Sequence, residues 1–443
     1  MERENKNKFW KGVLVGALVT AFVGLSIVGV ATGISLIGRT VIDNHTQTQM
    51  IRDSRRNDTE ASNIDMKSVE KKITLLETII DKYFLFDQDT EKMEAGIYRG
   101  LMAGLDDPYS TYYTANAYQQ MKESTEGKYF GIGALVSQNP QSGIITIARV
   151  FKGSPSEEAG LLPGDIIYKV EDAEVTGLEL DLLVNEHIKG LEGTKVKMTV
   201  LRGTGYVDLE ITRRQVEIPT VEYEMMADNT GYVLVSQFDV VTPEQFIKAL
   251  TDLEGQGMER LVIDLRDNPG GVLDAVVEMA AYILPEDRMG GMLVYTEDKN
   301  EKGAKYFCKD QKIQMTANDG TETDRKYPKK DGHQIDVPIA VLINGNSASA
   351  SEVFAGCIKD YDWGVLVGTT TFGKGIVQHL IPLDDGTAIK LTTSHYFTPS
   401  GFDLHGKGIE PDVEIELEEE LKTKISIEPE EDNQLQKAIS VLQ

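Results

Sequence analysis

The chain has 443 residues, of which 41% are hydrophobic, so it is long enough to form two to four domains of about 100–200 residues each. It carries 71 acidic and 45 basic residues, which gives a net charge of −26 at pH 7. Because phosphate contacts need clustered lysine and arginine, this balance argues against a nucleic-acid-binding surface. The two cysteines, Cys308 and Cys357, have no metal-ligand spacing, and buried apolar thiols are the favoured interpretation.

The N-terminal region contains a long uncharged segment, residues 13–38, which follows a lysine-rich stub. As a helix this segment would span about 39 Å, more than the roughly 30 Å hydrocarbon layer of a membrane. It is also longer than the apolar part of a cleavable signal peptide, which is the alternative. We therefore expect residues 1–38 to form a cytoplasmic stub and a single-pass transmembrane helix, a signal anchor. The basic flank then keeps the N-terminus in the cytoplasm and places the rest of the chain on the extracytoplasmic side of the cell membrane.

Two amphipathic helices are expected after the anchor. Residues 39–63 are polar and are predicted to be a linker, and residues 64–125 form an N-terminal helical region. Within that region, apolar side chains recur at three- and four-residue steps, first at Ile73, Leu76, Ile80 and Tyr83 and then at Met93, Ile97 and Leu101.

A small β-rich domain is expected over residues 126–214. The segment YFGIGALV, residues 129–136, supplies a glycine-containing loop that leads into a strand, and residues 150–170 then give strand, short helix, turn and strand. This order resembles the circularly permuted PDZ domains of bacteria. The resemblance implies that backbone N–H groups of the loop bind a C-terminal carboxylate. The implied ligand-binding residues are Phe130, Gly131, Ile132 and Gly133; a small β-domain without a ligand is the alternative.

The remaining chain has the pattern of an α/β domain over residues 215–420. Residues 261–271, LVIDLRDNPGG, and residues 338–356, PIAVLINGNSASASEVFAG, each combine an apolar strand, a turn of small residues and a helix. Two such units predict a βαβ-type core with its site at the carboxyl ends of the strands. Lys312 to Lys330 is expected to be a polar surface insertion, and residues 421–443 a C-terminal acidic linker and helix.

A serine and a lysine in this domain are candidates for a catalytic pair. Ser349 is the middle serine of SASASE, and Lys374 follows it within FGKGIVQ. A serine hydroxyl attacks a carbonyl only if a base removes its proton, and a neutral lysine can do so. Lysine has an ordinary pKa near 10.4, which burial lowers, and glycines on both sides of Lys374 favour a tight, buried turn. The amide of Gln378, four residues later, could orient the lysine without adding negative charge.

The order serine, lysine, glutamine at these spacings resembles the C-terminal processing peptidases, a family of PDZ-containing Ser-Lys serine proteases. GLDDPYSTYYT, residues 104–114, and residues 396–415 match further family signatures, so the resemblance runs from residue 64 to the C-terminus. It implies a mixed α/β and β multidomain fold with a protease core like those of ClpP and crotonase. It also implies that no metal or organic cofactor is needed, that the PDZ domain binds protein C-termini, and that the helical region forms a homodimer contact.

 The ligands implied for the PDZ domain are protein or peptide substrates with free, apolar C-termini.

The same resemblance assigns roles to individual residues. Ser349 is the nucleophile of a serine-type endopeptidase and Lys374 its general base, with Gln378 as the third catalytic residue. The N–H of Ala350 and that of either Gly270 or Gly271 form the oxyanion hole. Arg202 is expected to link peptide binding in the PDZ domain to the lysine site. Arg266 and Glu352 are expected to support the site through ion pairs or capping.

Three alternatives use the same residues differently. Residues 368–374, GTTTFGK, fit part of a phosphate-binding loop, but Gly375 stands where that motif needs serine or threonine for magnesium. A Ser-His site would draw its base from His379, His395 or His405. A catalytically silent PDZ-containing scaffold would bind protein C-termini without cutting them, and the presence of Ser349, Lys374 and Gln378 argues against it.

Overall fold

The computed structural model describes residues 64–310, 312–317, 320–326, 335–422, 424 and 427–443. In this part of the chain, residues 120–377 and 393–443 form one compact unit, and residues 64–119 and 378–392 form another. The predicted anchor at residues 13–38 and the linker at residues 39–63 lie outside the described residues. A search of the described residues finds no helix that is both long enough and apolar enough to cross a membrane.

The smaller unit contains the two predicted helices. They are α3 (Met66–Tyr83) and α4 (Thr90–Ala103), and both are confirmed. Each begins at an aspartate whose carboxylate accepts a backbone N–H three residues later, Asp65 from Ser68 at 3.2 Å and Asp89 from Lys92 at 3.0 Å. The short strand β1 (Thr111–Tyr113) follows and pairs antiparallel with residues 388–390.

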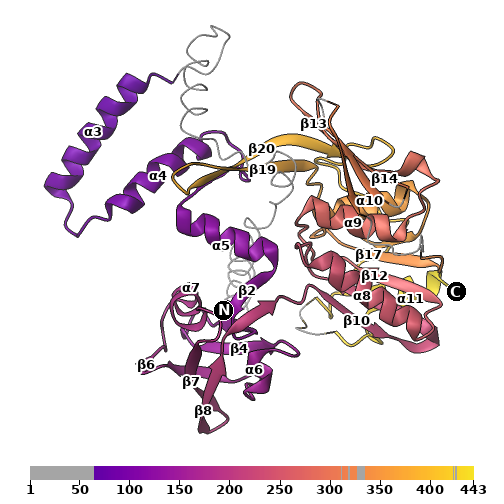
Figure 1. Cartoon of the computed structure of the whole chain (residues 1–443), viewed down its shortest axis with the longest axis horizontal. Helices are drawn as coiled ribbons and strands as arrows, with labels where there is room; N and C mark the ends of the chain where they lie inside the picture. Colours follow the sequence, from indigo (N-terminus) through magenta and orange to yellow (C-terminus); the bar gives the residue numbers. More distant parts are fainter. Residues whose placement is uncertain (1–63, 311, 318–319, 327–334, 423, 425–426) are drawn as a thin grey trace, which may run out of the picture. The chain divides into compact units, whose positions relative to one another are not determined.

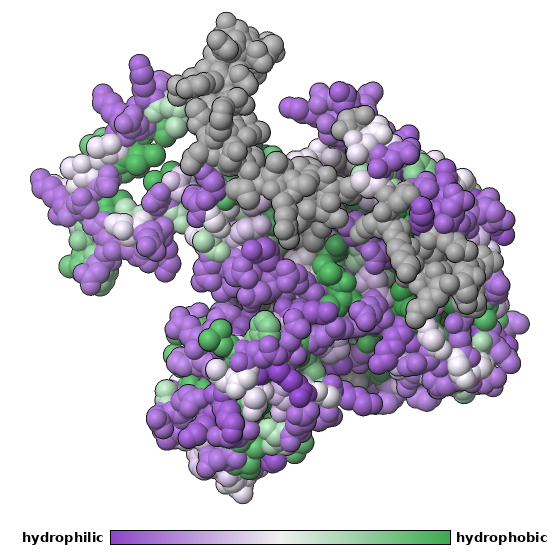
Figure 2. Space-filling view, viewed as in Figure 1, coloured by the Kyte–Doolittle hydropathy of each residue, from purple (hydrophilic) through white to green (hydrophobic). Residues whose placement is uncertain are grey.

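Helices α3 and α4 carry many exposed apolar side chains. No residue of α3 is buried, and Figure 2 shows apolar side chains on the surface of both helices. The large exposed members are Leu75, Leu76, Ile79, Tyr83, Ile97, Tyr98 and Leu101. The single chain therefore leaves an apolar surface here, and the homodimer contact expected for this region stays a prediction.

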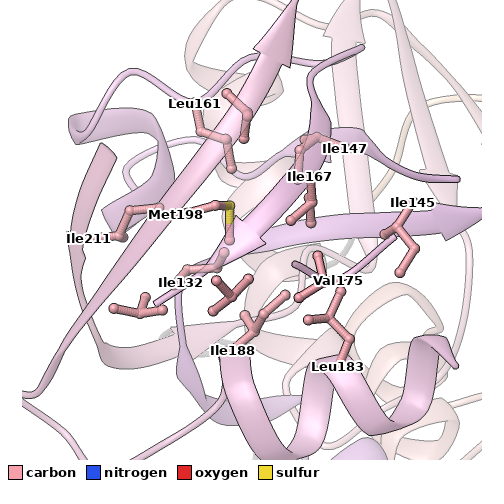
Figure 3. Packing of buried hydrophobic residues seen from close by; sticks show 13 residues of the cluster. Ile132, Ile145, Ile147, Leu161, Ile167, Val175, Leu183, Ile188, Met198 and Ile211 are labelled. Atoms are coloured by element: carbon pink, nitrogen blue, oxygen red, sulfur yellow. The ribbon is translucent and has the colours of Figure 1, made fainter. Parts of the chain in front are cut away.

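The β-rich domain is built on an antiparallel sheet (Figure 1), and it has its own apolar core. Its strands follow the order β3 (Ala134–Gln138), β4 (Ile145–Val150), β5 (Ile166–Val170), β7 (Lys195–Arg202) and β8 (Gly205–Thr212). Inward-facing apolar side chains of these strands pack against Leu183 and Ile188 of the π-helix η1 (Leu183–Ile188), as Figure 3 shows. The expected order of strand, short helix, turn and strand is present, with α6 (Pro155–Glu158) as the short helix.

The α/β domain is built on a mostly parallel sheet. Its strands follow the order β10 (Val221–Met225), β11 (Thr230–Val235), β12 (Arg260–Asp264), β17 (Ile339–Ile343), β18 (Val365–Gly368) and β21 (Val413–Glu414), and β10 alone in this sheet is antiparallel. Three helices accompany it, α8 (Thr242–Gly255), α9 (Leu273–Ile283) and α10 (Ala350–Asp360) (Figure 1). The two predicted strand–turn–helix units are β12 with α9 and β17 with α10, and their strands are direct neighbours.

The C-terminal helix α11 (Asn433–Val441) packs on the sheet of the α/β domain. Leu435, Ala438 and Leu442 pack with apolar side chains of β12, β17 and β18. At its start, the buried Asp432 carboxylate accepts the N–H groups of Gln434 and Leu435, both at 3.0 Å. The segment expected to be an acidic linker and helix thus contains a helix that covers the sheet.

A second group of antiparallel strands contains the expected surface insertion. These strands are β13 (Met292–Asp298), β14 (Lys305–Lys309), β15 (Lys312–Thr316) and β16 (Glu322–Lys326), paired in that order. Alternate residues of β14 and β15 are buried, so this segment is more than a polar loop. Cys308 and Cys357 are buried free thiols, as expected, and burial raises the pKa of Cys357.

Candidate active site

Three loops at the carboxyl ends of neighbouring parallel strands contain the residues singled out from the sequence. The loop after β12 contains Gly270 and Gly271, the turn after β17 contains Ser349, and the loop after β18 contains Lys374. This is the edge of the sheet at which the βαβ pattern predicted a site.

Ser349 lies in a strained turn immediately before α10. Its φ is 56° and its ψ is −114°, a conformation that residues other than glycine rarely adopt. The flanking serines tie this turn to the loop after β12, because Ser347 Oγ donates to the Leu265 carbonyl at 2.7 Å and Ser351 Oγ to the Asn268 carbonyl at 2.9 Å. Both flanking hydroxyls are thus engaged in holding the turn, while Ser349 itself is only half-buried.

Lys374 is buried, with 8% of its surface exposed, and the glycines beside it explain why. A Cβ on Gly373 would lie 3.1 Å from the backbone nitrogens of Lys407 and Gly408, and Gly373 has a φ of 88°. A Cβ on Gly375 would lie 2.7 Å from the His405 nitrogen. The glycines therefore let residues 405–408 pack directly on the lysine loop, so the tight, buried turn expected from the sequence is present.

One buried carboxylate joins the serine turn to the lysine loop. Glu352, in the first turn of α10, accepts the backbone N–H of Ser349 and that of Lys374 on the same oxygen, each at 2.8 Å. Its other oxygen accepts from Thr371 Oγ1 and from the Gly373 N–H, each at 2.6 Å. Burial raises the pKa of Glu352, whereas these four hydrogen bonds favour its charged form. The backbones of Ser349 and Lys374 are thus held by the same group.

This arrangement bears on the phosphate-loop alternative. In a phosphate-binding loop the backbone N–H groups point at the ligand phosphates. Here the N–H groups of Gly373 and Lys374 donate to Glu352 instead. The anion that these donors bind is part of the protein.

Tyr396, in strand β20 (Ala388–Phe397), makes a second bridge between the two segments. Its hydroxyl lies within hydrogen-bonding distance of the Ser349 carbonyl, at 2.9 Å, and of the Lys374 carbonyl. In the sequence, residues 396–415 match a family signature to which no role in the site was assigned. Tyr396 was therefore missed, and the signature was the one signal that pointed to it.

The glycine turn after β12 lies against the serine turn. A Cβ on Gly270 would lie 2.8 Å from both the Ala350 nitrogen and the Ser349 Cβ, so only glycine fits there. The Gly270 N–H donates to Asn268 Oδ1 at 2.9 Å. Gly271 and Phe238 form an isolated parallel β-bridge. Its two hydrogen bonds run from the Phe238 N–H to the Gly270 carbonyl and from the Val272 N–H to the Phe238 carbonyl. The Gly271 N–H is not used in that pairing.

Arg266, which precedes this glycine turn in the chain, forms ion pairs with two carboxylates. Its guanidinium bonds the Asp264 carboxylate at the end of β12, with a shortest distance of 2.6 Å, and the Asp432 carboxylate at the start of α11 at 2.7 Å. It also donates to Gln434 Oε1 at 3.0 Å. The C-terminal helix is therefore joined by charged hydrogen bonds to the strand that leads into the glycine turn.

Other residues considered as catalytic groups have contacts of their own. Gln378, on strand β19 (Ile376–Pro382), donates to Thr392 Oγ1 at 3.3 Å, and its expected action on Lys374 stays a prediction. His395 lies 4.0 Å from Asp403 Oδ1 and edge-to-face on His405, contacts that include neither Ser349 nor Lys374. Burial lowers the pKa of His379.

The residues expected to bind a ligand in the β-rich domain run from the end of β2 (Lys128–Gly131) to the residue before β3. Gly131, Ile132 and Gly133 are buried and Phe130 is exposed. Arg202 lies at the end of β7, where its guanidinium donates two hydrogen bonds of 2.7 Å to the Asp165 carboxylate. In this position Arg202 stabilises the domain that contains it, and its link to the lysine site stays a prediction.

The described residues contain no group of three or more histidine, cysteine, aspartate or glutamate side chains placed to hold a metal ion.

Comparison with known proteins shows which families this chain resembles. The model for "Peptidase family S41" matches residues 229–415, and the model for "PDZ domain" matches residues 129–212. A "Probable CtpA-like serine protease" of Staphylococcus epidermidis is 32% identical over 410 residues, which cover 93% of this chain and 74% of the relative. One of Staphylococcus aureus is 35% identical over 361 residues, covering 81% of this chain and 66% of the relative.

The chain thus spans about two thirds to three quarters of the length of these curated relatives. Among solved structures, the photosystem II D1 C-terminal processing protease is 28% identical, with a TM-score of 0.41, over 77% of this chain and 86% of that chain.

The bridging carboxylate gives a test of the site. Glu352→Gln should slow labelling of Ser349 by a fluorophosphonate probe by about 10- to 100-fold, the equivalent of about 1.4–2.8 kcal/mol. The amide places an NH₂ group against backbone N–H donors, so the serine turn and the lysine loop lose their common acceptor. The rate of labelling is measured by intact-protein mass spectrometry.

Glu410→Gln is the control, because it removes the same negative charge from an exposed side chain. It should leave the labelling rate unchanged. A Glu352→Gln protein that labels as fast as the unmodified protein would show that this carboxylate does not position Ser349.

Proposed function

Because this chain belongs to peptidase family S41, as a serine protease of the C-terminal processing type with a PDZ domain, we propose that Ser349 and Lys374 form its catalytic dyad. The observation that carries the proposal is that one oxygen of Glu352 accepts the backbone N–H of both residues. The burial of Lys374 supports it further, since a lysine away from water loses its proton more readily.

In the proposed reaction, Ser349 Oγ attacks the carbonyl carbon of the scissile peptide bond while its proton passes to the neutral Lys374 amine. The resulting oxyanion accepts hydrogen bonds from two backbone N–H groups. Ala350, the first residue of α10, supplies one, because the first N–H groups of a helix have no acceptor within it. Gly271 is assigned the other, since the Gly270 N–H already donates to Asn268.

The proton taken up by Lys374 then passes to the leaving amine as the peptide bond breaks, which leaves an ester between Ser349 and the N-terminal part of the substrate. A water molecule gives its proton to Lys374 and attacks this ester. Collapse of the second intermediate returns the proton to Ser349 Oγ. The substrates proposed are unstructured C-terminal regions of proteins, with Gln378 orienting the lysine amine.

The dyad has a clear kinetic signature. Ser349→Ala and Lys374→Ala should each lower kcat/KM for a peptide substrate by about 10³-fold or more, and the double variant should be little worse, because the two residues act as one unit. Lys374→Arg should fail too, since a guanidinium stays protonated. Activity of the unmodified enzyme should rise with pH, because a base works only when deprotonated.

Circular dichroism and peptide binding serve as controls for an intact fold in these variants. If Lys374→Ala kept substantial activity while a substitution at His379, His395 or His405 abolished it, the base would be a histidine. If neither the unmodified chain nor any variant labelled with a fluorophosphonate, the chain would be a silent PDZ scaffold.

We further propose that Arg202 couples ligand binding in the PDZ domain to turnover. Arg202→Ala should lower turnover of long substrates about fivefold or more while weakening peptide binding less. It should also lower the Tm of the PDZ domain, because the buried Asp165 carboxylate loses its main partner. Turnover, peptide affinity and Tm are measured on the same variants.

Asp165→Asn is the matched control, because it breaks the same ion pair and keeps the arginine. Equal losses of turnover in the two variants would assign Arg202 a stabilising role alone.

The hydrogen bond from Arg202 holds the pKa of Asp165 below its usual range. The pair therefore stabilises the fold above the unfolded carboxyl pKa of about 3.9, and the Tm difference between unmodified and Arg202→Ala protein should shrink as pH falls below it.

Finally, we propose that residues 13–38 anchor the protease in the cell membrane with its catalytic domain on the extracytoplasmic side. The support is the long uncharged segment and the basic stub before it. The protein should fractionate with membranes, and N-terminal sequencing should find the stub retained. A mature chain that begins after about residue 38 would mean that the segment is a cleaved signal peptide.

A further inference from the structure

The signature GLDDPYSTYYT, residues 104–114, forms a turn that leads into strand β1. Asp107 holds this turn together through both oxygens of its carboxylate. One oxygen accepts the N–H of Tyr109 at 3.1 Å, and the other accepts the hydroxyl of Ser110 at 2.5 Å. The direction of the Ser110 hydroxyl is thus set within its own turn.

Ser110 also contacts the neighbouring strand β20. Strand β1 pairs antiparallel with residues 388–390 of β20, and beyond these pairs the N–H of Thr392 donates to Ser110 Oγ at 3.0 Å. A serine hydroxyl has one proton, which Ser110 directs at Asp107, so its oxygen presents a lone pair to the Thr392 N–H. The turn therefore adds one hydrogen bond to the β1–β20 pairing and holds β20 at Thr392.

Thr392 in turn contacts the candidate catalytic residue Gln378. Strands β19 and β20 form a hairpin, in which the Leu383 N–H donates to the Thr387 carbonyl at 2.8 Å (Figure 1). Gln378 lies five residues before this pair and Thr392 five residues after it, so the two side chains are cross-strand neighbours. Gln378 Nε2 donates to Thr392 Oγ1 at 3.3 Å. A continuous series of hydrogen bonds thus joins the signature turn to Gln378.

We propose that the turn at residues 107–110 positions Gln378 for its action on the Lys374 amine, and that Thr392 transmits this effect. The inference rests on the proposed dyad and on the proposed orientation of the lysine amine by Gln378. It makes Asp107, Ser110 and Thr392 positioning residues, which act on the reaction through the Gln378 amide. The signature at residues 104–114 then has a part in the reaction as well as in the fold.

The chemistry of the amide fits this role. A glutamine oxygen accepts hydrogen bonds from a lysine amine, whereas the NH₂ group only donates. With Nε2 directed at Thr392, the acceptor atom Oε1 of Gln378 points away from Thr392. Both ends of the hydrogen-bonded series are shielded from water, since Ser110 is 7% exposed and Gln378 4% exposed. Water therefore does not readily replace these hydrogen bonds.

The test measures kcat and KM of the full-length enzyme for a fluorogenic peptide with a free, apolar C-terminus. Thr392→Val removes the hydroxyl that contacts Gln378 and keeps a β-branched side chain suited to a strand. It should lower kcat about 3- to 10-fold with little change in KM, as expected for one lost hydrogen bond. Thr392→Ser, which keeps the hydroxyl, should retain most of the rate. Ser110→Ala should lower kcat in the same way.

A double-variant experiment separates positioning from stability. Gln378→Ala should lower kcat at least as much as Thr392→Val or Ser110→Ala, and neither of these should have a further effect in the Gln378→Ala protein, because both act through Gln378. Thr387→Val is the matched control. It removes a hydroxyl that donates to Asp385 at 2.6 Å in the same hairpin, and it should leave kcat unchanged.

Three results would overturn the inference. The first is an unchanged kcat in Thr392→Val, and the second is a loss that persists in full in the Gln378→Ala protein, which would indicate a purely stabilising turn. The third is an unchanged kcat in Gln378→Ala, which would remove Gln378 from the reaction and leave the dyad intact. Failure of the dyad itself is recognised separately, by activity retained in Ser349→Ala or Lys374→Ala.

Discussion

The arrangement of the candidate active site depends on the buried carboxylate of Glu352. Glu352 is fully buried, yet four donors surround it, and three of them are backbone N–H groups. Burying an unpaired carboxylate costs several kcal/mol, so this side chain is tolerated only because every donor is in place. The donors come from two separate segments, the serine turn and the lysine loop. Glu352 therefore also holds these two segments together.

That constraint explains why other parts of the site can be strained or crowded. Ser349 holds an unfavourable φ because its N–H is bound by Glu352 and its carbonyl lies against the Tyr396 hydroxyl. The lysine loop is pressed against residues 405–408, a contact that only glycines at 373 and 375 permit. Both loops are thus held through their backbones.

The sequence was informative wherever a local rule decides the structure. Strand–turn–helix patterns located β12 with α9 and β17 with α10, and flanking glycines correctly indicated a buried Lys374. It was less informative for contacts made over long separations. The bonds from Glu352 to residues 371–374, and from Arg266 to Asp432, join segments that only the folded sheet brings together. No periodicity or turn chemistry marks such partners, so Glu352 and Arg266 were expected only as ion-pair or capping groups.

The donors of the lysine loop have a permanent acceptor inside the protein. Backbone N–H groups of Gly373 and Lys374 donate to the Glu352 carboxylate, and a charged acceptor binds such donors more strongly than a neutral one does. The same carboxylate accepts the N–H of Ser349, so it holds the serine turn and the lysine loop together through their backbones. The relative position of these two backbone segments is therefore set by the fold.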